Sequence, residues 1–156
     1  MPTSISIALK KLRRERQERA IEDLLFAYPG LIHPELARPR RQTCLGPDSR
    51  ADLLFEIGNR FVLVEIKRDI IRPAAVRQIE RYGRGLSVAL SRISGYLVAP
   101  EIDPQAEQCL AKASFPIRFL RLGVDIPPAI HICLRCRRAY DRRLSACPFD
   151  GETRTI

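Results

Sequence analysis

The sequence predicts an α/β fold, with a mixed sheet covered by helices and followed by a small metal-stabilised tail. Short apolar runs alternate with segments of helical periodicity, which is the pattern of α/β folds. The dipeptide Gly58-Asn59 joins two of these runs and indicates a hairpin, so part of the sheet is expected to be antiparallel. The last 26 residues hold three of the five cysteines but too few apolar side chains for a core. This tail therefore needs a cross-link or a metal to fold.

Composition and charge narrow the class of protein and of partner. The 156 residues are 46% hydrophobic and 29% charged, as in globular proteins. No apolar run reaches the roughly 20 residues of a membrane span, and no secretory signal is recognisable, so we expect a cytoplasmic protein without a membrane partner. The net charge is +9, and 23 of the 27 cationic residues are Arg, whose planar guanidinium suits phosphate. Nucleic acid is the favoured partner, although codon usage in a GC-rich genome also explains a preference for Arg.

The first predicted element is an amphipathic helix with a basic beginning. Residues 1–20 carry six cations and two acids, and an apolar stripe then continues to Pro29-Gly30. The stripe consists of Ile21, Leu24, Leu25 and Tyr28. We expect residues 1–20 to form a basic extension of this helix, either as a solvated face or as a phosphate-contacting one.

The remaining elements follow in the order β-β-β-α-β-α-β. Strands are predicted at 41–45, 51–57, 60–67, 95–99 and 117–122, and helices from Pro73 to about Ala89 and over 104–113. The predicted domains are the basic extension 1–20, a core domain 21–122, a linker 123–130 that contains Pro127-Pro128, and the tail 131–156.

Acidic residues gather on the predicted hairpin. Asp52 lies in its first strand, and Glu65-Ile66-Lys67 ends its second strand after an apolar run. Because strand side chains alternate between faces, Glu65 and Lys67 point to one side and Ile66 to the other. Two carboxylates on one hairpin repel each other unless a cation lies between them, and oxygen ligands suit Mg²⁺ or Mn²⁺.

The spacing Asp52-x12-Glu65-x-Lys67, with Glu22 on the helix before it and Gln78-x-x-x-Tyr82 on the helix after it, resembles the PD-(D/E)XK nuclease superfamily. Further blocks are similar to the catalytic domain of the NucS/EndoMS endonucleases over residues 20–122. These blocks are Glu22-Asp23-Leu24-Leu25, Pro29-Gly30-Leu31-Ile32, Arg50-Ala51-Asp52-Leu53-Leu54, Val62 to Arg68, Gln78 to Tyr82 and Gly95 to Pro100. The resemblance implies a restriction-endonuclease-like mixed-sheet core and a metal-dependent endodeoxyribonuclease that acts in DNA repair or in defence against foreign DNA.

The resemblance also implies a role for each matched residue. Asp52 and Glu65 would hold the divalent cation, with the backbone carbonyl of Ile66 as a further ligand. Glu22 would reach the site directly or through water. Full-length members of the family carry an additional amino-terminal domain for DNA binding and dimer formation, so their preference for mismatched or flap DNA is not expected to transfer.

Three other matched residues complete the implied site. Lys67 would position or help to deprotonate the attacking water and offset charge in the transition state. Gln78 would line the site, and Tyr82, one helical turn later, would pack beside it or belong to the core. Cutting both strands of a duplex needs two such sites, which favours a homodimer.

The cysteine tail has the spacing of a zinc ribbon. Cys133-x-x-Cys136 is followed by Cys147-x-x-Asp150, in which an aspartate occupies the slot of the usual fourth cysteine. We expect a structural Zn²⁺ at these four residues, with His131 as the alternative fourth ligand. A disulfide and a ribbon without metal are the alternatives to zinc. Elsewhere in the chain, Cys44 and Cys109 are expected to be small buried apolar residues.

Two other functions are compatible with the same residues. The chain could be a catalytically inactive module that binds nucleic acid or a protein on a nuclease fold, or a ribonuclease. Intact Asp52, Glu65 and Lys67 favour an enzyme over an inactive relic.

Overall fold

The computed structural model describes residues 18–19, 21–44, 50–126, 130–136, 139–141 and 144–153. Apart from Glu18 and Arg19, the basic extension predicted at residues 1–20 lies outside these ranges. The side chain of Cys44 also lies outside the described part of the chain.

A five-stranded mixed sheet forms the centre of the molecule, in the order β1-β2-β3-β5-β7. Its strands are β1 (Arg40–Cys44), β2 (Arg50–Ile57), β3 (Arg60–Ile66), β5 (Ile93–Ala99) and β7 (Ile117–Arg121). The first three strands pair antiparallel, and β3, β5 and β7 pair parallel. Gly58 allows the tight β2–β3 hairpin because its φ of +59° lies in the left-handed region that favours glycine. The predicted α/β fold is confirmed.

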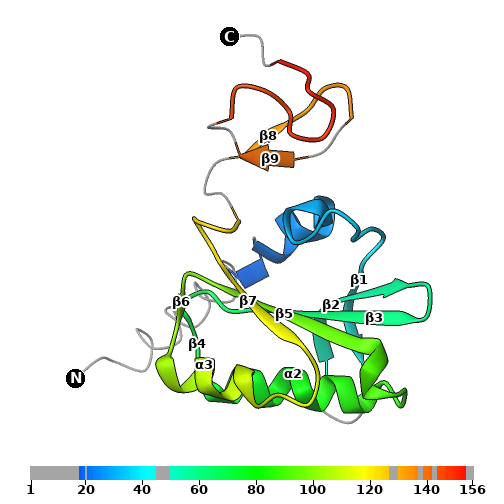
Figure 1. Cartoon of the computed structure of the whole chain (residues 1–156), viewed down its shortest axis with the longest axis vertical. Helices are drawn as coiled ribbons and strands as arrows, with labels where there is room; N and C mark the ends of the chain where they lie inside the picture. Colours follow the sequence, from blue (N-terminus) through cyan, green and yellow to red (C-terminus); the bar gives the residue numbers. More distant parts are fainter. Residues whose placement is uncertain are drawn as a thin grey trace, which may run out of the picture.

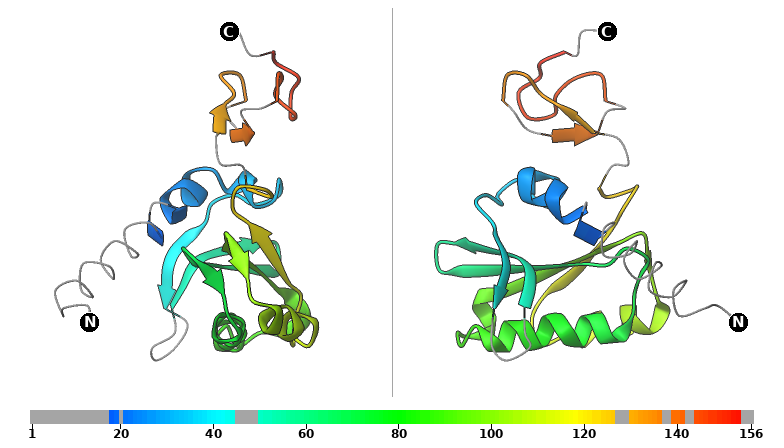
Figure 2. Two further views of the ribbon diagram at one scale, coloured as in Figure 1. Left: turned by 90° about the vertical axis from the view of Figure 1, so that its left-hand side faces the viewer. Right: turned by 180° about the vertical axis from the view of Figure 1, so that it is seen from behind.

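Helices cover both faces of this sheet (Figures 1 and 2). On one face, α2 (Pro73–Gly85) connects β3 to β5, and α3 (Pro104–Ala111) connects β5 to β7. On the other face lie the first helix, described over residues 18–19 and 21–27, and the short 3₁₀ helix η1 (Pro29–Leu31). Parallel strands require such crossover connections, which explains why helices follow β3 and β5. Each face of the sheet has a buried apolar cluster of its own.

Helix α2 begins at Pro73 as predicted but ends at Gly85, four residues before the predicted end. Its end is set by the backbone of Leu86 and Ser87, whose N–H groups donate to the carbonyls of Gly83 and Arg84. Ser87 has a φ of +54°, which cannot continue a right-handed helix. A second 3₁₀ helix, η2 (Leu90–Arg92), then leads into β5.

Two further strands have no sequence signal. β4 (Ile70–Ile71) and β6 (Glu101–Ile102) pair parallel in a small separate sheet. Strands of two residues are too short to show periodicity, so this pairing is decided by where the longer elements bring the chain together.

The predicted linker 123–130 begins with residues that belong to the core. Ile126 is only 1% exposed and packs in the apolar cluster beneath the first helix. The backbone N–H of Gly123 donates to the carbonyl of Ile126 over 2.7 Å, which turns the chain back onto the sheet. The packed body that contains the sheet therefore reaches Ile126.

The tail forms a small antiparallel pair, β8 (Ile130–Ile132) and β9 (Ala139–Asp141), on the side of the sheet that carries the first helix (Figures 1 and 2). β9 contacts η1, and Phe149 lines a small cavity together with Tyr28, Pro29 and Leu36. Among the described side chains of the tail, the buried ones are Cys133, Cys147 and Tyr140, so the core of this part is assembled around the cysteine cluster.

Candidate active site and metal cluster

Asp52 and Glu65 lie opposite each other on the central hairpin. β2 and β3 pair Leu53 with Val64, and one step further along the same register brings Asp52 opposite Glu65. The backbone N–H of Ile66 donates to Asp52 Oδ2 over 2.8 Å, which fixes that carboxylate against β3. The two predicted acidic ligands therefore come together through strand pairing.

Glu65 is buried and Asp52 is partly buried, and the pKa values of both carboxyl groups are raised. Burial, followed by the charge of Asp52, raises the pKa of Glu65 to about 8. Burial also raises the pKa of Asp52 to about 6, and Glu22 adds to this increase. Glu65 Oε2 is buried and has no hydrogen-bond partner among the described residues. An orphaned carboxylate oxygen beside a second carboxylate fits a hard divalent cation.

Lys67 is the one cation that contacts this pair in the described part of the chain. Its Nζ lies 3.4 Å from Glu65 Oε1, and its side chain is partly exposed. Its backbone N–H donates to Val98 O over 2.9 Å, so the parallel pairing with β5 positions it. The predicted arrangement of Glu65 and Lys67 on one side of the strand is present.

Glu22 is buried beside this site but is held by neighbours of its own. Arg41 Nε donates to Glu22 Oε1 over 3.0 Å, and Gln42 Nε2 lies 3.1 Å from both carboxylate oxygens. Arg41 also forms an ion pair with Asp23. Gln42 reaches across to Asp52 Oδ1, again over 3.1 Å, and so links the first helix to β2.

Gln78 and Tyr82 approach the site from α2. The side-chain amide of Gln78 donates to the Tyr82 hydroxyl, one helical turn away. Tyr82 is only 3% exposed and belongs to the apolar cluster under α2. Burial raises the pKa of the Tyr82 hydroxyl, and the charge of Glu65 contributes to this increase. Tyr82 is thus a core residue whose hydroxyl is influenced by the charge of Glu65.

A pocket of about 610 Å³ opens beside Asp52 and mixes carboxylates with guanidinium groups. It is lined by Glu18, Arg19, Glu22, Arg41, Gln42, Arg50 and Asp52. Sequence reasoning missed four of these, Glu18, Arg41, Gln42 and Arg50, and placed a fifth, Arg19, only in the basic extension. The spacing of Glu18 and Glu22, one helical turn apart, could have suggested the first. Arg41 and Gln42 lie in a predicted strand and Arg50 directly precedes another, but strand periodicity does not indicate which other element a polar side chain contacts.

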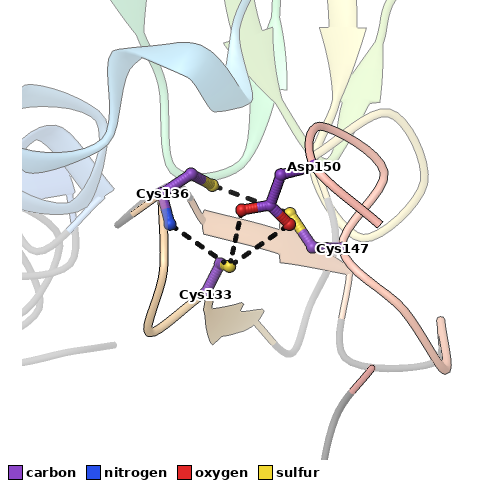
Figure 3. Close-up of side chains that lie close together, drawn as sticks. All are labelled: Cys133, Cys136, Cys147 and Asp150. Atoms are coloured by element: carbon purple, nitrogen blue, oxygen red, sulfur yellow. Dashed lines mark hydrogen bonds between the residues drawn. The ribbon is translucent and has the colours of Figure 1, made fainter. Parts of the chain in front are cut away.

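The tail contains a compact group of possible metal ligands. Cys133, Cys136, Cys147 and Asp150 each offer one ligand atom, and these atoms all lie within 4.8 Å of one another (Figure 3). It is the one such group of three or more Cys, His, Asp or Glu side chains in the described part of the chain. The pair Asp52 and Glu65 offers only two such side chains, so it does not form a group of three or more.

The sulfur spacing in this group fits a shared ion. Cys136 Sγ and Cys147 Sγ are 3.7 Å apart. Two thiolates about 2.3 Å from a tetrahedral zinc ion would be separated by about 3.8 Å, whereas a disulfide requires about 2.05 Å. Cys109 and the three tail cysteines are free. The cluster could therefore bind a metal such as zinc.

The structure favours Asp150 over His131 as the fourth ligand. Asp150 Oδ2 lies 3.4 Å from Cys133 Sγ, whereas the His131 ring packs edge-on against Tyr140 with the ring centroids 5.3 Å apart. Hydrogen bonding from the backbone N–H of Glu152 holds the pKa of Asp150 below its usual range, so this carboxylate is charged. Glu152, which the sequence did not single out, also contacts Cys133, with Oε2 at 3.0 Å from its sulfur.

Three solved structures are similar to this one. The crystal structure of a repair endonuclease from Pyrococcus abyssi has a TM-score of 0.56 and 28% sequence identity, over 67% of this chain and 45% of that chain. A complex of EndoMS with double-stranded DNA has a TM-score of 0.58 and 27% identity, over 74% of this chain and 46% of that chain. EndoMS in its apo form has a TM-score of 0.55 and 29% identity, over 67% of this chain and 46% of that chain.

The predicted resemblance to the EndoMS-type repair endonucleases is confirmed. The mixed sheet with its flanking helices is their endonuclease-like fold, as expected from the sequence. This chain spans slightly less than half the length of each EndoMS-type chain. No family model matches the sequence, and no curated protein does either. None of the described helices is long and apolar enough to span a membrane.

Proposed function

We propose that this protein is a divalent-cation-dependent endodeoxyribonuclease that hydrolyses phosphodiester bonds in DNA repair or in defence against foreign DNA. The observation that carries this proposal is the pair formed by the buried Glu65 and the partly buried Asp52, with an orphaned carboxylate oxygen and Lys67 beside it, within an EndoMS-type fold. Such a pair is unfavourable unless a cation or a proton compensates it.

Asp52 and Glu65 would hold Mg²⁺ or Mn²⁺, with the Ile66 carbonyl as a further ligand. The bound ion would polarise the scissile phosphate and lower the pKa of a water ligand. The residues around it keep this arrangement rigid. The N–H of Ile66 donates to Asp52 Oδ2, which holds this end of β3 next to that carboxylate.

Lys67 would act on the nucleophile and on the developing charge. Its ammonium is held by Glu65 and partly exposed, so it can meet a phosphate oxygen or orient the attacking water. Gln78 and Tyr82 would line the site from α2, where the side-chain amide of Gln78 donates to the hydroxyl of the buried Tyr82.

The partner that these surfaces suit is DNA. One similar protein is bound to double-stranded DNA. Arg19 and Arg50 are exposed at the pocket beside Asp52, where they would contact phosphates next to the cleaved bond. Cleavage of both strands would need two sites, so we propose a homodimer on duplex DNA.

Arg50→Ala is expected to weaken DNA binding for all sequences alike and to lower the slope of log affinity against log salt concentration by about 1. Phosphate contacts release counterions and carry no base identity. Arg118→Ala is the matched control, because Arg118 is exposed on β7, at the opposite edge of the sheet from β1. Equal salt slopes for Arg50→Ala and wild type, measured by fluorescence anisotropy, would remove Arg50 from the interface.

The direct test of the proposed function is cleavage of defined substrates. Purified protein is incubated with linear, branched, mismatched and single-stranded DNA and with RNA, with and without Mg²⁺ or Mn²⁺. We expect metal-dependent cleavage of at least one DNA substrate. Binding of DNA without cleavage of any substrate would favour the inactive binding module, and cleavage of RNA alone would favour a ribonuclease.

The protein without bound Mg²⁺ or Mn²⁺ is expected to lose stability as the pH rises from about 5 to about 8. Burial raises the pKa of Glu65 to about 8, whereas an unfolded glutamate has a pKa of about 4.3. The folded state therefore binds this proton more tightly than the unfolded state. The contribution of this proton to the free energy of unfolding is complete below the pKa of the unfolded state and is lost as the pH rises through the pKa of the folded state.

Glu65→Gln cannot ionise at this position and should show a smaller loss of stability over the same range. The measurement is the free energy of urea unfolding of zinc-loaded protein at a series of pH values, without added Mg²⁺ or Mn²⁺. The same pH slope in wild type and Glu65→Gln would show that Glu65 does not titrate in this way.

We also propose that the tail is a zinc ribbon, with one structural Zn²⁺ held by Cys133, Cys136, Cys147 and Asp150. The 3.7 Å separation of two of its sulfur atoms supports this ion. Four protein ligands leave no position for a reactive water, so the zinc would stabilise the fold and take no part in cleavage.

A further inference from the structure

Gln42 has a backbone conformation that few residues other than glycine adopt in a strand. Its φ is +47°, in the middle of β1. Arg41 pairs with Leu53 and Thr43 with Ala51, so the register places Gln42 opposite Asp52, yet these two form no ladder pair. Strained residues of this kind persist where the surrounding structure holds them, often at functional sites.

The unusual conformation has a local consequence at Glu22. Successive side chains of a regular strand point to opposite faces of the sheet. Here Arg41 and Gln42 follow each other in β1, and both hydrogen-bond the same carboxylate of Glu22. The left-handed backbone at Gln42 breaks the alternation and brings both donors to one acceptor.

The amide of Gln42 joins two carboxylates. Its Nε2 lies 3.1 Å from both oxygens of Glu22 and 3.1 Å from Asp52 Oδ1. An amide nitrogen has two N–H groups, so one can serve each carboxylate. The amide oxygen cannot take this place, because it would face two acceptors.

Asp52 is thereby fixed at both of its oxygens. Oδ1 accepts from Gln42 in β1, and Oδ2 accepts from the backbone N–H of Ile66 in β3. Each carboxylate oxygen can accept more than one hydrogen bond or ligand, so both remain able to bind a cation while the group cannot rotate. Glu22 is anchored in turn by Arg41.

We propose that Gln42 is a positioning residue that sets the orientation of the Asp52 carboxylate for the divalent cation, and that Glu22 acts through Gln42. This inference rests on the proposed function, because it takes Asp52 as a metal ligand. In this proposal, Glu22 holds the side-chain amide of Gln42 in place. The resemblance, by contrast, implied that Glu22 reaches the metal directly or through water.

The test measures Mn²⁺ affinity in zinc-loaded protein by electron paramagnetic resonance of free Mn²⁺. Gln42→Met keeps the length of the side chain but removes both N–H groups, and Gln42→Gly removes them while relieving the backbone. Both variants should bind Mn²⁺ about 10- to 100-fold more weakly, as is typical when the partner of a metal ligand is lost. The Mn²⁺ concentration for half-maximal DNA cleavage should rise by the same factor.

Ser87→Gly is the matched control, because Ser87 also has a positive φ, of +54°, and is exposed at the end of α2. It should leave Mn²⁺ affinity unchanged. Gln42 is exposed on the edge strand β1, so its substitution opens no cavity, and circular dichroism verifies folding. If Gln42→Gly does not fold, Gln42→Met carries the test.

Two results separate this inference from the proposed function. Mn²⁺ affinity that falls in Asp52→Ala but equals the wild-type value in Gln42→Met would overturn the role of Gln42 alone. Mn²⁺ affinity that is the same in wild type and Asp52→Ala would overturn both proposals, since Asp52 would then be no ligand.

Discussion

Asp52→Ala and Glu65→Ala are each expected to lower the rate of DNA cleavage by about 10³-fold or more. A bound divalent cation supplies several kcal/mol of transition-state stabilisation, and each 1.4 kcal/mol corresponds to a factor of ten in rate. Removing one of two carboxylate ligands removes most of the affinity for the ion. The measurement is single-turnover cleavage of a labelled duplex at a Mg²⁺ or Mn²⁺ concentration that just saturates wild type, together with DNA affinity, which should change little.

Glu56→Ala provides the control for this prediction. Glu56 lies on β2 like Asp52, but its side chain is exposed and pairs with Arg40 over 2.5 Å. This variant removes an acid from the same strand without touching the carboxylate pair, so its cleavage rate should stay near that of wild type. Full activity of Asp52→Ala under conditions where wild type cuts would show that the acidic pair is not the catalytic centre.

Removal of zinc is expected to unfold the tail. The binding free energy of a structural zinc ion is about 10 to 16 kcal/mol, and in a segment without its own apolar core this energy becomes folding energy. A zinc-selective chelator, in the presence of excess Mg²⁺, should therefore unfold residues 131–156. The described part of the tail packs on η1, but the nuclease-like body has two apolar clusters of its own and should stay folded.

Metal analysis and single substitutions locate this ion. Wild type should contain about one zinc per chain, Cys133→Ser should lose it, and Cys109→Ser should keep it, because Cys109 lies on α3 outside the cluster. Asp150→Ala should weaken zinc binding more than His131→Ala. Zinc retained at full affinity in Asp150→Ala but lost in His131→Ala would reverse the choice of fourth ligand.

The pairing of the acidic residues could be predicted from sequence because it follows from local rules. The Gly58-Asn59 turn sets the register of the hairpin, and this register carries Asp52 to a position opposite Glu65. Strand alternation then places Lys67 on the side of Glu65. The tail cysteines were also predictable, since two short knuckle spacings define a ligand set without reference to the rest of the fold.

The sequence by itself thus determined the α/β fold, the hairpin that carries Asp52 and Glu65, and the cysteine cluster, because turn residues, periodicity and short spacings act over a few neighbours. Only the tertiary structure decided what surrounds the carboxylates. The contact of Gln42 with both Glu22 and Asp52 joins three elements. It depends on a left-handed backbone in β1, which a glutamine in the sequence does not predict. The burial of Ile126 and the docking of the tail on η1 were likewise decided by packing, because side chains far apart in the sequence exclude water together only once the sheet has formed.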